Sequence, residues 1–169
     1  MGDVGWLFAV NRGRRAAGTE PGAVLCGDSV MSDSASRSTL LARVLVIDDE
    51  LEPVDLLSAV LSDSGYEVVS ALNGGDGLRL VEIERPDVVL LDLQMPGVAG
   101  FDVLRRVRTV RPDLPVIIVS GQADLNVARA TLNEGAVDYV SKSFEPEDVV
   151  RAVAAALTNR PALGRALRA

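Results

Sequence analysis

The sequence predicts an α/β fold, a doubly wound five-stranded parallel sheet with helices on both faces. From residue 42 onward, short runs of valine, leucine and isoleucine alternate with stretches of helical length, a pattern typical of βαβ units. The runs are almost continuously apolar, as in strands that are buried on both faces. A chain of 169 residues with 48% hydrophobic residues suits one such domain.

The expected strands are the apolar runs themselves. The first, Val-Leu-Val-Ile, and the third, Val-Val-Leu-Leu, contain no polar residue and are bounded by charged ones. Runs of this length and composition favour buried strands over helices. The five expected strands cover residues 44–47, 67–71, 88–91, 116–119 and 137–140.

The expected helices lie between and after these strands, and glycine or proline marks their ends. Gly65 ends the first, Pro86 closes the second, and Pro112 limits the third, because proline cannot continue a helix. Gly135 follows the fourth as a C-terminal cap, and Pro146 opens the fifth in its first turn. The five expected helices cover residues 53–64, 75–84, 101–110, 124–133 and 146–157.

The two flanks differ from this core. Residues 1–41 are rich in Gly, Ser, Asp and Arg without sustained periodicity, so we expect a mostly disordered leader. Residues 42–158 form the predicted domain, and residues 159–169 a short tail. Met31 precedes a plausible shorter leader, which leaves open whether residues 1–30 belong to the native protein.

Composition excludes several classes of protein. The chain has no histidine, which removes serine–histidine catalysis and imidazole metal ligation. The single cysteine, Cys26, cannot form an intramolecular disulfide. A net charge of −7 disfavours sequence-independent binding to nucleic acid. No apolar run approaches the ~20 residues of a membrane helix, so we expect a cytoplasmic protein.

Polar side chains follow the expected strands where they end. With a flavodoxin-like strand order 2-1-3-4-5, these ends converge at the edge of the sheet where ligands bind. The residues in question are Asp48, Asp49, Glu50, Asp92, Ser120 and Lys142. Clustered carboxylates repel one another unless a cation lies among them. A hard divalent cation with oxygen ligands is therefore expected, and Mg²⁺ is the one we favour because it keeps several waters and takes only one or two protein carboxylates. Asp92 is then a candidate nucleophile toward phosphorus, with Mg²⁺ and Lys142 offsetting the phosphoryl charge.

Lys142 stands out among the basic residues. It is the one lysine among 17 basic residues, and all the others are arginine. A compact, rotatable ammonium suits a position facing carboxylates where a planar guanidinium does not fit.

The segments around these residues resemble the receiver domain of bacterial two-component response regulators. The resemblance covers about residues 42–158 and rests on the segments 44–50, 90–97, 118–121 and 138–142. It implies a stand-alone response regulator whose Asp92 accepts a phosphoryl group from a sensor histidine kinase or a histidine phosphotransfer protein. It also implies a protein that is not an enzyme beyond slow self-phosphorylation from small donors and self-dephosphorylation.

The resemblance assigns roles to individual residues. Mg²⁺ is expected at Asp48, Asp49, Asp92 and the backbone carbonyl of Gln94. Ser120 and Lys142 join Asp92 in the phosphorylation chemistry, Ser120 and Tyr139 act as the switch, and Gln94 and Gln122 tune the lifetime of the phosphate. The surface that the switch alters is expected to include Ala128, Thr131, Leu132 and Tyr139.

We expect output through a downstream protein target, without direct binding to DNA or membrane, and we leave phosphorylation-dependent homodimerisation open. One departure from the family is Ser143, where a proline usually follows the lysine. Two alternative functions also stay open. A pseudo-receiver scaffold would keep the fold without taking phosphate, and Ser143 allows it. A Mg²⁺-dependent phosphohydrolase would need a second acid near Asp92, where this chain has Gln94.

Overall fold

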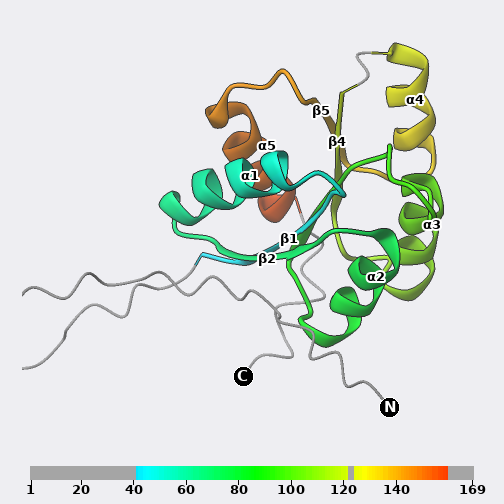
Figure 1. Cartoon of the computed structure of the whole chain (residues 1–169), viewed down its shortest axis with the longest axis horizontal. Helices are drawn as coiled ribbons and strands as arrows, with labels where there is room; N and C mark the ends of the chain where they lie inside the picture. The colour runs from blue at the N-terminus through cyan, green and yellow to red at the C-terminus, as the bar shows by residue number, and fades with distance from the viewer. Residues whose placement is uncertain (1–40, 122–123, 160–169) are drawn as a thin grey trace, which may run out of the picture. The chain divides into compact units, whose positions relative to one another are not determined.

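A computed structural model of the chain describes residues 41–121 and 124–159. Within these ranges, strands and helices alternate without exception (Figure 1). The elements are β1 (Arg43–Ile47), α1 (Leu51–Asp63), β2 (Glu67–Ala71), α2 (Gly74–Ile83), β3 (Val88–Leu91), α3 (Gly100–Val110), β4 (Val116–Ser120), α4 (Leu125–Asn133), β5 (Asp138–Ser141) and α5 (Pro146–Thr158). The expected leader (apart from Leu41), the tail after Asn159, and Gln122 lie outside the described residues.

The strands form one sheet with the order β2-β1-β3-β4-β5, and every neighbouring pair is parallel. This confirms the predicted fold class and strand order. Ile47 of β1 pairs with Leu91 of β3, and Leu91 pairs with Ile118 of β4. The chain therefore leaves the three central strands at the same edge of the sheet.

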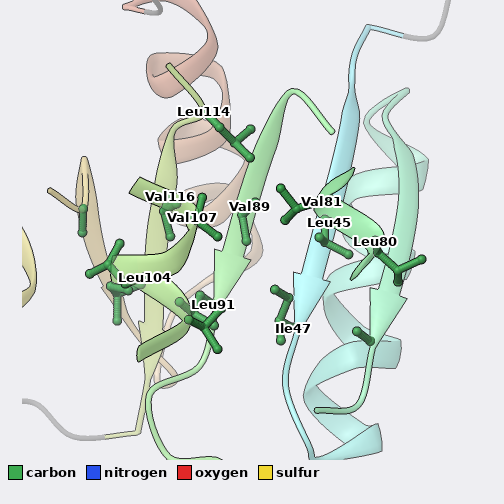
Figure 2. Close-up of a cluster of buried hydrophobic side chains, with 14 of the residues drawn as sticks. Leu45, Ile47, Leu80, Val81, Val89, Leu91, Leu104, Val107, Leu114 and Val116 are labelled. Carbon is green, nitrogen blue, oxygen red and sulfur yellow. The ribbon is translucent and has the colours of Figure 1, made fainter. Parts of the chain in front are cut away.

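Helices cover both faces of the sheet, and each face has its own apolar cluster. The side chains of the central strands alternate between the two clusters: Leu45 and Ile47 point to one, Val44 and Val46 to the other. One cluster packs under α2 and α3 (Figure 2), and the second under α1 and α5. β1, β3 and β4 are buried on both faces, which agrees with their almost continuously apolar sequences.

Helix α4 is anchored differently from the other helices. Its one buried residue is Thr131, whereas each of the other four helices buries several residues. A helix that buries little apolar surface gains little stability from packing.

Most element boundaries agree with the expected ones to within one residue, but α1 does not. It begins at Leu51, two residues before the expected start near Pro53. The first N–H groups of a helix have no acceptor within the helix, so the missing N–H of Pro53 costs nothing in the first turn.

Gly65 and Gly135 end α1 and α4 in the same way. Both adopt a positive φ, of 89° and 98°. After α1, the N–H of Gly65 donates to Ser62 and that of Tyr66 to Leu61. This pair of hydrogen bonds satisfies helix carbonyls that would otherwise lack a donor, and the same pattern follows α4. The predicted glycine stops are therefore confirmed.

Gly100 lets the start of α3 approach the chain that leaves β3. A Cβ atom at Gly100 would lie 2.3 Å from the carbonyl oxygen of Asp92 and 2.6 Å from Cα of Leu93. Those atoms belong to the backbone, so they cannot rotate away as a side chain would. The position of the segment after β3 thus depends on the absence of a side chain at Gly100.

We predict that Gly100→Ala lowers the free energy of unfolding by roughly 1–3 kcal/mol, the usual cost of overpacking, because the added methyl group displaces the backbone at Asp92. Urea denaturation measures this. Gly75→Ala is the matched control, since a Cβ there meets nothing nearer than 3.4 Å and the substitution favours the helix. Equal stability of Gly100→Ala and the wild type would contradict the steric argument.

Candidate functional site

The candidate site lies at the edge of the sheet where the parallel strands end. Asp48 follows β1, Asp92 follows β3, and Lys142 follows β5. Their backbone N–H groups each donate to a carbonyl on the neighbouring strand, at 3.1, 2.9 and 2.8 Å respectively. The acceptor for Lys142 is the carbonyl of Ser120, the last residue of β4. The hydrogen-bond ladder of the sheet thus continues into the site and holds its backbone in place.

Three carboxylates meet at this edge. Asp48 is 2% exposed and Asp92 1% exposed, while Asp49 is half-buried. One carboxylate oxygen from each of the three lies within 4.8 Å of the others. Among the described residues, Asp49 Oδ1 and both carboxylate oxygens of Asp92 are buried and accept no hydrogen bond of ordinary geometry.

Buried carboxylate oxygens without donors are costly, and a hard cation satisfies them. Mg²⁺ takes oxygen ligands and binds through one or two carboxylates while keeping several waters. The donor set at Asp48, Asp49 and Asp92 therefore fits this ion.

Lys142 is the cation that the chain itself supplies. Its Nζ lies 2.9 Å from Asp48 Oδ2 and 3.5 Å from Asp92 Oδ2. A third carboxylate, Glu50, approaches the same Nζ at 3.5 Å. Glu50 was among the strand-end residues expected at this edge, but no role was predicted for it, and the structure places it beside Lys142. Its side chain is largely exposed, so it is the member of the group that is free to move.

Burial and the neighbouring charges shift the pKa values of Asp92 and Lys142. Burial raises the pKa of Asp92, and the charge of Asp48 adds to the rise, while Lys142 and the backbone N–H of Gln94 oppose it. Burial alone would lower the pKa of Lys142, but the hydrogen bond and charge of Asp48, together with the charges of Asp92 and Glu50, outweigh it and raise this pKa. One ammonium among several carboxylates leaves an excess of negative charge.

The remaining expected site residues lie around this centre. Ser120 is fully buried, and its backbone is hydrogen-bonded to that of Lys142. Tyr139 pairs with Ile118 in the sheet and packs, partly buried, against the apolar cluster under α2 and α3. The Gln94 side chain is exposed at the rim of the site.

The two serines on either side of Lys142, Ser141 and Ser143, form a hydrogen bond with each other. The Oγ atoms of Ser141 and Ser143 share a hydrogen bond of 2.9 Å, and the N–H of Ser143 donates to Ser141 Oγ at 3.4 Å. Side-chain hydrogen bonds of this kind stabilise a turn locally. This turn lies at position 143, where the resemblance to receiver domains implies a proline.

One residue of the surface that the switch is expected to alter is buried instead of exposed. Thr131 is fully buried, so the prediction that it lies on an exposed face was wrong. Its Oγ1 donates to the carbonyl of Ala128 at 2.8 Å, and a hydroxyl satisfied within its own helix can face the interior. Leu132 is 45% exposed, while Ala128 and Tyr139 are partly buried.

Among the described residues, no helix has the length and apolar character needed to cross a membrane.

Comparisons with known proteins agree with this geometry. Residues 44–154 match the model of the response regulator receiver domain. Protein PilH of Pseudomonas aeruginosa is 36% identical over 119 residues, covering 69% of this chain and 98% of PilH. Sporulation initiation phosphotransferase F of Bacillus subtilis is 32% identical over 111 residues, covering 66% of this chain and 90% of that protein.

Longer relatives contain the same domain. The probable transcriptional regulatory protein TcrX of Mycobacterium tuberculosis is 36% identical over 107 residues, covering 63% of this chain and 46% of TcrX. The response regulator MprA of Mycolicibacterium vanbaalenii is also 36% identical, with 50% of its length covered. The chain thus spans about half the length of these two mycobacterial relatives.

Solved structures share the fold. A receiver domain protein of Methanospirillum hungatei superposes with a TM-score of 0.67 at 32% identity, covering 71% of this chain and 96% of that one. One from Clostridium thermocellum superposes with the same TM-score at 35% identity, covering 70% and 95%. With the matched segment, the strand order and the acidic strand ends in agreement, the chain belongs to the response regulator receiver domain family of two-component systems.

Proposed function

We propose that this chain is a phosphorylation-driven binding switch in which Asp92 accepts a phosphoryl group from a sensor histidine kinase or a histidine phosphotransfer protein. The observation that carries the proposal is the Asp92 carboxylate itself. It is buried without a hydrogen-bond donor of ordinary geometry among the described residues, next to two other aspartates and 3.5 Å from an ammonium.

The proposed phosphoryl transfer is a substitution at phosphorus. An oxygen of Asp92 forms a bond to the phosphorus of a phosphohistidine while the P–N bond breaks, and the leaving imidazole keeps the electron pair and takes up a proton. Lys142 stabilises the charge on the phosphoryl oxygens, because its Nζ already lies 3.5 Å from Asp92 Oδ2 in a partly buried site where charge interactions are strong.

Asp48, Asp49, Asp92 and the backbone carbonyl of Gln94 would hold Mg²⁺. When bound, the ion supplies positive charge that offsets both the carboxylates and the incoming phosphoryl group. The buried oxygens of Asp49 and Asp92 that accept no hydrogen bond of ordinary geometry support this assignment.

The switch would act through the buried hydroxyl of Ser120 and the ring of Tyr139. A phosphoryl group on Asp92 offers new acceptors to Ser120 and so biases a pre-existing equilibrium between two states. The affected surface would lie over α4 and β5, where Leu125 is 77% and Leu132 45% exposed. A downstream protein would recognise this surface, and a second copy of the chain is the alternative partner.

Asp92→Asn is expected to abolish phosphorylation. Wild-type protein incubated with acetyl phosphate and Mg²⁺ should gain a single acid-stable, base-labile phosphoryl group by intact mass, and the variant should gain none. Asp55→Asn, which changes an exposed acid on α1, should behave as wild type. A wild-type protein that binds Mg²⁺ yet gains no phosphoryl group would favour the scaffold alternative, and an adduct that survives in Asp92→Asn would assign the acceptor elsewhere.

Mg²⁺ is expected to stabilise the fold. Because the raised pKa of Asp92 means that its ionised form is less stable in the folded than in the unfolded chain, a cation at the site should raise the melting temperature by about 2–5 °C at saturation. Thermal scans with and without Mg²⁺ measure the difference. Asp49→Asn should remove most of it and Asp55→Asn none; an equal Mg²⁺ effect in all three proteins would argue against the site.

We further propose that Gln94 lengthens the life of the phosphate by occupying the path of water to Asp92. Gln94→Ala should speed dephosphorylation roughly threefold to tenfold, which corresponds to about 1 kcal/mol in the barrier, because the amide no longer obstructs water. The substitution keeps the backbone carbonyl, so Mg²⁺ affinity should not change. Val98→Ala, in the same loop and 41% exposed, is the control. An unchanged rate in Gln94→Ala would remove its role in phosphate lifetime.

A further inference from the structure

The loop that carries Lys142 is held by the fold at two points. On one side, the N–H of Lys142 donates to the carbonyl of Ser120 at 2.8 Å, and Ser141 pairs with Ser120 in the sheet. On the other side, Phe144 packs, partly buried, against the apolar cluster under α1 and α5. Ser143 lies between these two points with an exposed side chain. Neither strand pairing nor apolar packing therefore fixes the peptide that joins Lys142 to Ser143.

Two hydrogen bonds between Ser141 and Ser143 restrict that peptide. The two Oγ atoms lie 2.9 Å apart, and either of them can donate. The N–H of Ser143 also donates to Ser141 Oγ, at 3.4 Å. Both bonds connect the residues on either side of Lys142, so they limit the backbone conformation of the lysine. The second bond needs an N–H at position 143, which a proline would not supply.

The contacts of the Lys142 ammonium are unequal, which makes its position sensitive to the backbone. Its Nζ lies 2.9 Å from Asp48 Oδ2, but 3.5 Å from Asp92 Oδ2 and from Glu50 Oε1. An ammonium on a flexible aliphatic stem can point toward any of these carboxylates. A shift of the backbone at Lys142 therefore changes the distance from the ammonium to Asp92.

We propose that Ser141 and Ser143 are positioning residues for Lys142. Their hydrogen-bonded pair holds the backbone of the lysine so that its ammonium reaches the phosphoryl group on Asp92. This inference rests on the phosphorylation proposed above. It assigns the ordering of the loop to two hydroxyls, at the place where the resemblance to receiver domains implies a proline.

The exposure of the serine pair separates a positioning role from a structural one. Both hydrogen bonds are open to solvent, so water competes for them and they add little to the stability of the whole fold. Removal of the pair should change the behaviour of Lys142 while the melting temperature stays close to that of the wild type.

The first measurement is an NMR spectrum of the full chain labelled with ¹³C,¹⁵N-lysine. Lys142 is the one lysine in the chain, so every lysine signal reports on this side chain. In the wild type, the two Hε protons should have separate shifts, because a held ammonium places them in different surroundings. Ser143→Ala should bring the two shifts together. Ser143→Thr, which keeps the hydroxyl and the N–H, should restore their separation.

The second measurement is the rate of phosphorylation by acetyl phosphate at saturating Mg²⁺. Ser141→Ala and Ser143→Ala should each lower the maximal rate roughly threefold to tenfold, because a displaced charge stabilises the transferred group less well. The Mg²⁺ concentration that gives half the maximal rate should not change, since the carboxylates are untouched. The double variant should be no slower than the slower single variant, because the two serines act as one pair.

Ser64→Ala is the matched control. It removes a hydroxyl that donates to the carbonyl of Val60 at the end of α1, and it should match the wild type in both measurements.

The outcomes distinguish this proposal from the one on Asp92. A wild-type protein that gains no phosphoryl group would contradict the function proposed for Asp92, and the lysine spectrum would still decide whether the serines position Lys142. A phosphorylated wild type with unchanged rates in Ser141→Ala and Ser143→Ala would overturn the positioning role. Coincident Hε shifts in the wild type would do the same, and so would additive losses in the double variant, which would show that the serines act independently.

Discussion

The parallel register of β1, β3 and β4 positions the carboxylates of the candidate site. Because Ile47, Leu91 and Ile118 lie side by side in the sheet, whatever follows each strand meets at one edge. The sheet is buried on both faces, so a slip of one strand would expose apolar residues to solvent and bury polar ones. The packing of two apolar clusters therefore determines where the carboxylates lie.

That placement brings buried carboxylates together, and the protein's own cation, Lys142, neutralises their charge only in part. Asp48 and Asp92 are almost fully buried, and Lys142 alone among the described basic residues reaches both of them. A buried carboxylate that is incompletely paired destabilises the folded state. The same deficit supports the Mg²⁺ site proposed at this edge and the role proposed for Asp92. In that proposal, folding stability is lower at the residues on which the function depends.

The helices divide between those that build the core and one that does not. α1, α2, α3 and α5 each bury several residues against the sheet, whereas α4 buries only Thr131. The end of α4 is tied to α3 by the exposed, two-pronged pair of Arg105 and Glu134. Exposed ion pairs contribute little stability, so α4 is the described helix that can change position at the lowest cost, next to the strand that carries Tyr139.

The class of fold, its strand order and the strand-end residues around Asp92 could be predicted from the sequence, because apolar runs and glycine stops are local signals that tertiary contacts did not override. Which side chains meet depends instead on tertiary contacts. The burial of Thr131 and the approach of Glu50 to Lys142 both depend on contacts between elements distant in the chain or on the packing around them. The start of α1 at Leu51, before Pro53, is a further example. Proline is tolerated throughout the first turn of a helix, so the sequence does not show whether the helix begins at the proline or shortly before it. Local pattern fixes the type of an element, but exposure, hydrogen bonding and charge pairing are properties of the assembled fold.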